Sequence, residues 1–332
     1  MEGENALNPT DVGVILSYRC HNACRHCVYN CGPRWTDWMD VDTVYAALQT
    51  IHDHIPTAQV HLTGGEPFLN LPLLLESVKI ARQFGIPTRV ETNAGWCTHP
   101  GKVDDAFSIL HEAGLGAVLI SCTPFHAETI PLTRTLLAID KALAIFGPHN
   151  VFVFLPEGID QLLRFGTRSP VPLERFIETY GMDPAGFLLW EEFGLLSGGR
   201  AGYRLGHLVQ RKPVDDFIGE SCTREILFSP CLLFDLYENL IPGPCAGLSL
   251  GSWKHVHEIS GRISTGSLPV LVKILVDAGP YGLFCFARDQ YHYRPLPQGY
   301  AGKCHLCVDV RKYLKMQADF PELEPVDYYR YD

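Results

Sequence analysis

Up to about residue 200, the chain alternates short apolar runs with amphipathic stretches. The apolar runs predict buried strands at residues 12–19, 59–62, 87–92, 116–121 and 151–155, with a sixth at 187–190. Helical spacing between them predicts helices over residues 41–54, 71–84, 103–113 and 132–146. Asp40 or Asp42 would cap the first helix, and Gly85, Gly114 and Gly147 would end the other three.

This alternation predicts an α/β fold. Strands joined through helices pair in parallel by right-handed crossovers, and continuous apolar strands suit a parallel sheet that is buried on both faces. We therefore expect a partial (β/α)6 TIM-like barrel. In such sheets, ligands bind at the carboxyl ends of the strands.

Beyond about residue 200 the pattern changes. Glycine and proline become frequent, the apolar runs shorten, and six of the 12 cysteines appear: Cys222, Cys231, Cys245, Cys285, Cys304 and Cys307. We expect two domains, a core barrel over residues 1–205 and a smaller α+β module over residues 206–332 that is held together by its own metal site.

Charge and hydropathy exclude several classes of partner. The 332 residues contain 27 basic and 37 acidic side chains, a net charge of −10 that disfavours binding to nucleic acid or anionic lipid. No apolar run approaches the roughly 20 residues of a membrane helix, and the first residues lack the features of a signal peptide. We therefore expect a cytoplasmic protein without a membrane or nucleic-acid partner.

A cysteine loop follows the first predicted strand. Cys20, Cys24 and Cys27 have the spacing CxxxCxxC, and the cysteine content is too low for a disulfide scaffold, so the cluster favours metal binding. Three thiolates would leave one iron of a [4Fe–4S] cube without a protein ligand. A zinc site that uses Cys31 as its fourth ligand is the alternative.

A second motif, Thr63-Gly64-Gly65-Glu66-Pro67, follows the second strand. Its glycines let a ligand approach the backbone closely, and Glu66 offers a carboxylate to a cation. Taken alone, the motif is equally typical of a tight turn with a surface glutamate. In a parallel sheet, however, it lies on the same rim as the cysteine loop.

The pair of motifs, CxxxCxxC followed by GGEP, resembles the radical SAM superfamily over roughly residues 12–200. The resemblance implies that Cys20, Cys24 and Cys27 ligate a [4Fe–4S] cluster whose fourth iron binds S-adenosylmethionine (SAM). Reductive cleavage of SAM would give a 5′-deoxyadenosyl radical, which takes a hydrogen atom from the substrate. His26 would lie against the adenine, and the segment formed by Gly64, Gly65, Glu66 and Pro67 would receive the methionyl ammonium.

Further polar residues follow the third and fourth strands. Thr92, Asn93 and Ser121 close these strands and suit ribose hydroxyls and a carboxylate, while His126 and Arg134 come shortly after. Each of them is equally explained as a turn, cap or surface residue. Their common rim groups them as SAM-binding candidates, with Arg134 or Arg200 toward the methionine carboxylate. The sequence names no catalytic residue beyond these.

The later cysteines resemble the SPASM/twitch auxiliary-cluster modules of some radical SAM enzymes. The resemblance implies a second [4Fe–4S] cluster on Cys222, Cys245, Cys304 and Cys307, with Cys231 and Cys285 as substitutes. Residues 235–239 stand at the turn of that pattern, where Glu238 replaces the usual glycine. A structural zinc on four thiolates is the alternative.

For the reaction, the resemblance implies an oxidoreductase-like enzyme that oxidises its substrate or forms a new bond with help from the auxiliary cluster. A redox-neutral epimerase, lyase or rearrangement enzyme is the alternative. Outside this class stand an iron–sulfur electron carrier and a zinc-stapled interaction protein. The substrate would be a small molecule or a peptide, although only 19 residues precede Cys20, which disfavours a leader-guided peptide. A low-potential flavodoxin or ferredoxin would supply electrons.

Overall fold

The computed structural model describes residues 7–154, 156–180 and 196–330. Its internal contacts divide the chain into two compact units. The sheet unit comprises Gly13–Cys24 and Cys31–Phe193, and the C-terminal unit comprises Met1–Val12, Arg25–Asn30 and Gly194–Asp332. The predicted domain boundary at residues 205/206 stays a prediction.

The sheet unit is built on five strands: β1 (Asp11–Ser17), β2 (Gln59–Gly64), β3 (Thr88–Thr92), β4 (Ala117–Ser121) and β5 (Val151–Phe154). They lie in the order β5-β4-β3-β2-β1, and β2 to β5 pair in parallel. The register aligns Leu62, Val90, Val118 and Val151 in one apolar row across the sheet. The predicted α/β fold with a parallel sheet is confirmed. The sixth predicted strand, at residues 187–190, lies outside the described residues.

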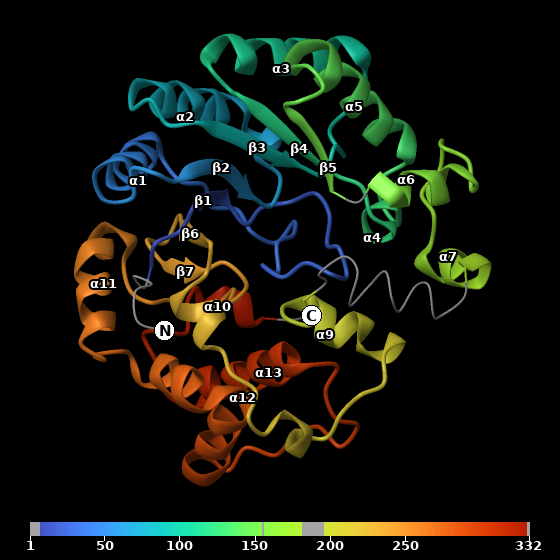
Figure 1. The fold of residues 1–332 in the computed structure, drawn as a ribbon. Helices are drawn as coiled ribbons and strands as arrows, with labels where there is room; N and C mark the ends of the chain where they lie inside the picture. The colour runs from blue at the N-terminus through green and yellow to red at the C-terminus, as the bar shows by residue number, and fades with distance from the viewer. Residues whose placement is uncertain (1–6, 155, 181–195, 331–332) are drawn as a thin grey trace. The chain divides into compact units, whose positions relative to one another are not determined.

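The main helices of this unit are α1 (Val41–His54), α2 (Leu71–Gln83), α3 (Pro100–Ala113) and α5 (Leu132–Phe146). All four lie along one face of the sheet (Figure 1). Helices on a single face are typical of a barrel segment, whereas a doubly wound sheet carries helices on both faces. Closure into a partial (β/α)6 barrel nevertheless stays a prediction.

Helix boundaries follow local rules. Asp40 caps α1, because its Oδ1 accepts a hydrogen bond from Thr43 N at 2.7 Å. Gly85, Gly114 and Gly147 end α2, α3 and α5 with φ values of 68°, 118° and 77°, which favour glycine. The shorter helices of this unit are η1 (Pro67–Asn70), α4 (Pro124–Ala127), α6 (Pro156–Leu163) and α7 (Leu173–Tyr180).

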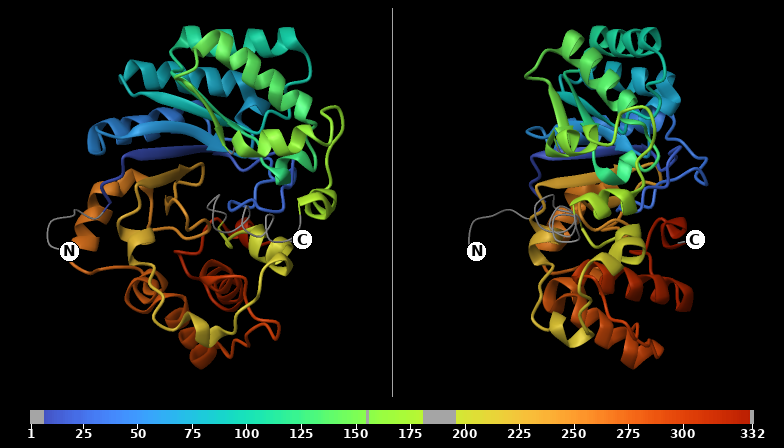
Figure 2. Two further views of the ribbon diagram at one scale, coloured as in Figure 1. Left: turned by 45° about the vertical axis from the view of Figure 1, so that its right-hand side comes forward. Right: turned by 90° about the vertical axis from the view of Figure 1, so that its right-hand side faces the viewer.

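The C-terminal unit combines a hairpin with helices. Strand β6 (Cys231–Asp235) pairs antiparallel with β7 (Leu240–Pro242). Its helices are α9 (Arg200–Leu205), α10 (Thr223–Leu227), α11 (Val256–Ser264), α12 (Val270–Tyr291) and α13 (Lys303–Gln317). Among its described residues the unit also has the 3-10 helices η2 (Gly206–Leu208), η3 (Val214–Phe217), η4 (Trp253–His255) and η5 (Val326–Tyr329). Helices α12 and α13 pack side by side (Figure 2).

The hairpin turn is the one that the sequence marks at residues 235–239. Asp235 Oδ1 accepts from Tyr237 N and from Asn239 N, at 3.0 and 2.8 Å. Glu238 adopts a φ of 69°, the left-handed conformation for which glycine is best suited. This backbone therefore explains in physical terms why glycine would suit the position that Glu238 occupies.

Helix α12 has the length and apolarity of a membrane-spanning helix, with 22 residues and a mean hydropathy of 1.6 in its most apolar window. Non-helical backbone at Gly279, directly before Pro280, kinks it. Leu271, Leu275 and Leu283 are buried in the unit, as in the core helix of a globular protein.

Candidate functional site

The GGEP loop is tied to the end of β1. Gly65 N donates to Ser17 O and Glu66 N donates to Arg19 O, both at 2.9 Å. A Cβ atom on Gly64 would lie 2.2 Å from Ser17 O, and one on Gly65 would lie 2.0 Å from Arg19 O. The glycines therefore make room for the neighbouring backbone, whatever ligand they also admit. The two motif loops start from adjacent strands and are fixed to each other at this rim.

Glu66 is buried, with 1% of its surface exposed, so the alternative of a surface glutamate is wrong. Its Oε1 accepts from Thr92 Oγ1 at 2.9 Å and from Phe68 N at 3.3 Å, while its Oε2 accepts from Asn93 N at 2.9 Å. Burial raises the pKa of this carboxyl to about 7, although the hydrogen bonds act in the opposite direction. Glu66 thus joins the loop after β2 to the end of β3.

Asn93 links this rim to the cysteine loop. Its Nδ2 donates to Cys20 Sγ at 3.4 Å. A Cβ atom on Gly95 would lie 1.8 Å from His21 Nε2, so a larger residue there would displace the His21 ring. From α5, Arg134 Nη1 donates to Gly95 O at 2.7 Å. Burial, together with the charge of Arg134, lowers the pKa of His21, which is therefore neutral at pH 7. The predicted residues Cys20, Asn93 and Arg134 are brought together, and His21 and Gly95 are additions that no motif signalled.

His126 and Ser121 lie at the end of β4. Ser121 is its last residue, and His126 belongs to the short helix α4 that follows. His126 Nδ1 lies 2.8 Å from Thr123 Oγ1, and burial lowers the pKa of His126 to about 4. His126 is therefore a neutral polar group at pH 7.

The rest of the cysteine loop is divided between the units. Cys24 belongs to the sheet unit, whereas His26 and Cys27 belong to the C-terminal unit, and both cysteines are half-buried. In the C-terminal unit, Arg200 N donates to Cys27 O at 3.1 Å, and Arg200 Nη1 donates to Asn30 Oδ1 at 2.9 Å. The start of α9 therefore holds residues 25–30. Cys31, the alternative zinc ligand, is buried in the sheet unit.

Four cysteines of the C-terminal unit line one cavity of about 70 Å³: Cys222, Cys245, Cys304 and Cys307. They come from the N-cap of α10, the loop after β7 and the first turns of α13. Burial, and then the neighbouring Cys307 thiolate, raises the pKa of Cys304 to about 12. The structure thus brings together the four cysteines that the sequence groups. The substitutes lie elsewhere, since Cys231 begins β6 and Cys285 lies in α12.

Two cations line the same cavity, Lys303 and Arg311. Arg311 is only 2% exposed, and its Nη1 donates to Ala246 O and to Tyr329 Oη, each at 3.0 Å. No sequence motif identifies either residue, although the helical spacing of Arg311 from a cysteine is a usable signal. Arg311 follows Cys307 by four residues in α13, which places the two on one helix face.

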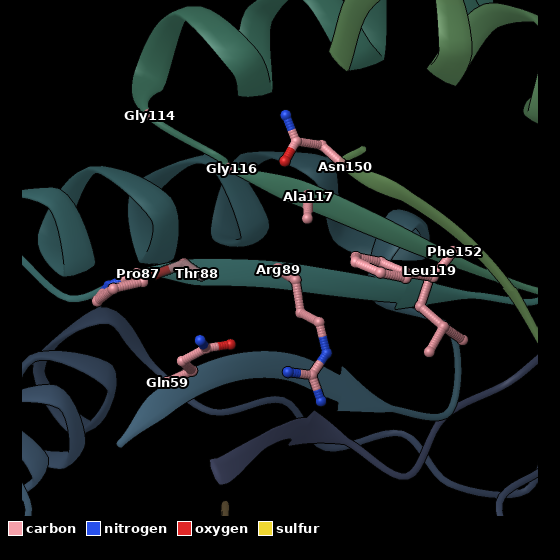
Figure 3. Close-up of a pocket in the computed structure, with 10 residues that line it drawn as sticks. All are labelled: Gln59, Pro87, Thr88, Arg89, Gly114, Gly116, Ala117, Leu119, Asn150 and Phe152. Atoms are coloured by element: carbon pink, nitrogen blue, oxygen red, sulfur yellow. The ribbon is translucent and has the colours of Figure 1, made fainter. Parts of the chain in front are cut away.

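A larger cavity, of about 560 Å³, opens on the sheet face opposite the helices. Figure 3 shows Arg89, Leu119 and Phe152 on this face, with Arg89 extending from β3 toward β2. Gln59 and Asn150 line it at the starts of β2 and β5. The cavity therefore lies at the amino ends of the strands, the opposite end from the rim that carries the two motif loops.

Comparisons with known proteins agree with these motifs. The profile of the radical SAM superfamily matches residues 14–146. YydG of Bacillus subtilis strain 168, to which a role in peptide biosynthesis has been ascribed, is 25% identical over 119 residues, which are 36% of this chain and 37% of that protein. The match thus spans little more than a third of that relative.

Among solved structures, BtrN in complex with AdoMet and 2-DOIA is similar with a TM-score of 0.48 and 14% identity, over 82% of this chain and 89% of that one. The structure of anSMEcpe with bound AdoMet gives a TM-score of 0.35 and 11% identity, over 95% and 98%. The family match contains the cysteine loop, the GGEP loop and the strands that carry them. Residues 14–146, which carry both motif loops, therefore match the radical SAM superfamily.

Proposed function

We propose that Cys20, Cys24 and Cys27 hold the [4Fe–4S] cluster at which SAM is cleaved. The observation that carries this proposal is the junction of the two motif loops, in which Gly65 and Glu66 donate to the backbone around Ser17 and Arg19, directly before Cys20. The donor set fits the group, because three thiolates leave one iron open. When bound and reduced, the cluster supplies the electron that converts SAM into methionine and a 5′-deoxyadenosyl radical.

The surrounding residues bind and orient SAM. Because the side chain of Glu66 is occupied by internal donors, the backbone of residues 64–66 receives the methionyl ammonium. Arg134, whose Nη1 is anchored on Gly95, pairs with the methionine carboxylate. Ser121 and His126 face the ribose, and His26 lies against the adenine.

For the C-terminal unit, the proposal is a second [4Fe–4S] cluster on Cys222, Cys245, Cys304 and Cys307. The cavity of about 70 Å³ that these residues line supports it. A structural zinc ion on the same four thiolates is the alternative. Four protein ligands close the site to substrate, so its role is to accept or relay an electron.

For the substrate, we favour a peptide over a small molecule, on the strength of the similarity to YydG. The radical removes a hydrogen atom from this peptide, and the second cluster then takes an electron from the substrate radical, so that the net reaction is an oxidation or a new bond. A product mass two hydrogens below that of the substrate supports this outcome. An unchanged mass overturns it in favour of a redox-neutral reaction.

The first experiment tests SAM cleavage. We expect the anaerobically reconstituted protein to form 5′-deoxyadenosine from SAM and dithionite, and the Cys24→Ala variant to lose this activity by at least about a hundredfold. Cys285→Ser is the matched control, because Cys285 lies outside both cysteine groups. A Cys24→Ala protein that still forms 5′-deoxyadenosine at the normal rate contradicts the ligand assignment.

The second experiment counts metal. We expect about eight irons and eight sulfides per chain, which fall to about four in a Cys304→Ser/Cys307→Ser variant. A Cys231→Ser/Cys285→Ser variant keeps the full number, because neither residue lines the cavity. If the unmodified protein contains zinc and only about four irons, the second site is a structural zinc site and not an iron–sulfur cluster.

A further inference from the structure

The guanidinium of Arg311 is a buried charge in the C-terminal unit, and the partners recorded for it are neutral. Its Nη1 donates to the carbonyl oxygen of Ala246 and to the hydroxyl of Tyr329. Its Nε is buried and, within the described part of the chain, has no hydrogen-bond partner. A buried cation that lacks an anionic partner costs several kcal/mol, so the fold must compensate it.

The four-cysteine cavity supplies the missing negative charge. Arg311 lines this cavity together with all four cysteines, and it follows Cys304 and Cys307 on α13 by seven and four residues, which places the three on one helix face. Thiolates bound to iron are anionic, whereas the free thiols are neutral. The charge of Arg311 is therefore balanced when the cysteines hold a metal centre.

Lys303 also lines the cavity but is differently placed. Its Nζ lies 2.8 Å from Glu225 Oε1 and donates to Ser221 O at 2.8 Å. Glu225 therefore offsets most of the charge of Lys303. Of the two cations, Arg311 therefore contributes more to the net positive electrostatic potential in the cavity.

We propose that the positive charge of Arg311 raises the reduction potential of the cluster held by Cys222, Cys245, Cys304 and Cys307. This inference rests on the proposed function, which places a cluster there. On reduction, one electron passes from the substrate radical or the external reductant to the cluster, and no bond forms or breaks at Arg311. The cluster becomes more anionic, and a fixed cation in a low-dielectric site stabilises that state more than the oxidised one.

The effect would separate the two clusters in function. SAM cleavage needs a cluster at the low end of the iron–sulfur range. A cluster beside a buried guanidinium is easier to reduce, which suits an acceptor of electrons. Arg311 would thereby make the C-terminal cluster the one that takes an electron from the substrate radical.

The test measures the potential of this cluster alone, in the full-length chain. A Cys20→Ala/Cys24→Ala/Cys27→Ala background removes the first cluster, and an anaerobic redox titration followed by electron paramagnetic resonance gives the midpoint of the second. We expect Arg311→Gln to lower the ratio of reduced to oxidised cluster at least tenfold at a fixed potential, which corresponds to a midpoint about 59 mV lower for one electron.

Three variants keep the test specific. Arg311→Lys retains the charge, and Tyr329→Phe removes a hydrogen-bond partner of Arg311 but leaves its charge, so each changes the ratio less than about threefold. Arg288→Gln removes an exposed arginine of α12 that pairs with Asp289, and leaves the midpoint unchanged. If Arg311→Gln does not retain iron, Arg311→Met, which keeps much of the side-chain volume without its charge, carries the test, and its midpoint must fall below that of the background protein.

The outcomes separate the inference from the proposed function. A normal midpoint in Arg311→Gln, or an equal shift in Tyr329→Phe, overturns the role of the Arg311 charge and leaves the cluster in place. A background protein that binds zinc or no iron overturns the second cluster itself, and the inference with it.

Discussion

At the scale of single residues, Glu66 shows how a motif residue serves the fold. Its carboxyl oxygens accept from Thr92, Asn93 and Phe68, and they fix the rim of the sheet on which the two motif loops lie. A carboxylate so deeply buried is more easily protonated, and its pKa is raised to about 7. The protonation state of this rim therefore changes within the physiological range of pH.

The raised pKa of Glu66 makes stability depend on pH. In the unfolded chain this carboxyl has its ordinary pKa of 4.5, so between pH 4.5 and about 7 the folded state binds the additional proton. Stability from this group is therefore complete below pH 4.5, and up to about 3 kcal/mol is lost as the pH rises through 7. Urea unfolding at pH 5.5 and 7.5 should show about 2 kcal/mol of this loss in the natural protein and a smaller loss in Glu66→Gln. Equal losses in both proteins would contradict the assignment to Glu66.

Gly65 gives a steric prediction at the same scale. A Cβ atom there would lie 2.0 Å from Arg19 O, a backbone atom that cannot move aside without displacing the start of the cysteine loop. Gly65→Ala should therefore lower the free energy of unfolding by at least about 3 kcal/mol and reduce iron retention. Gly101→Ala is the control, because nothing lies within 4 Å of that Cβ, and its effect should stay within about 1 kcal/mol. Similar losses in both variants would refute the steric argument.

Part of the candidate site could be predicted from the sequence. The resemblance to SPASM/twitch modules groups Cys222, Cys245, Cys304 and Cys307, which lie up to 85 positions apart, and the structure places all four around one cavity. Their role as metal ligands stays a prediction. In contrast, the place of His21 beside Gly95 depends on where two loops meet, and local patterns carry no information about that. For Arg311, the sequence shows the four-residue helical spacing from Cys307, but it does not show that the side chain is buried.

At the scale of elements, the first helix separates two residues that the sequence leaves as alternatives. Asp40 Oδ1 accepts from Thr43 N at 2.7 Å, whereas Asp42 is an acidic residue in the first turn. Asp40→Ala should cost about 1 kcal/mol of stability, through loss of the cap. Asp42→Ala should cost only about 0.3 kcal/mol, through the helix dipole. Thermal or urea unfolding of the two variants measures the difference, and the reverse order would show that Asp42 is the true cap.

The regular elements of the sheet unit were predictable because two local signals agree there. Apolar runs of strand length alternate with amphipathic helices, and glycine follows α2, α3 and α5. In the C-terminal unit, Gly279 and Pro280 interrupt α12, as sequence rules predict. The backbone of Gly279 is non-helical, so α12 consists of two helical segments that meet at a kink. Glycine is required at position 279, because a Cβ atom there would lie 1.8 Å from the backbone oxygen of Glu220.

At the scale of the whole molecule, the chain forms two units, each with its own buried core. The core of the sheet unit is apolar and continuous along its strands. The C-terminal unit instead surrounds a cavity lined by thiols, with the buried charge of Arg311 beside it. The proposed cluster would therefore contribute to the stability of this unit, because the free energy of metal binding becomes free energy of folding.

This difference predicts where the chain loosens when metal is lost. In a Cys222→Ser/Cys245→Ser variant of the full-length protein, amide hydrogen exchange in α10, α12 and α13 should rise at least about tenfold, because these helices line the cavity that the cysteines share. Amides of β3 and β4 should exchange at their normal rates, since their protection comes from apolar packing within the sheet unit. Cys285→Ser, outside the cavity, should leave both regions unchanged. An equal rise in β3 and β4 would mean that the two units unfold together and that the C-terminal metal centre stabilises the entire chain.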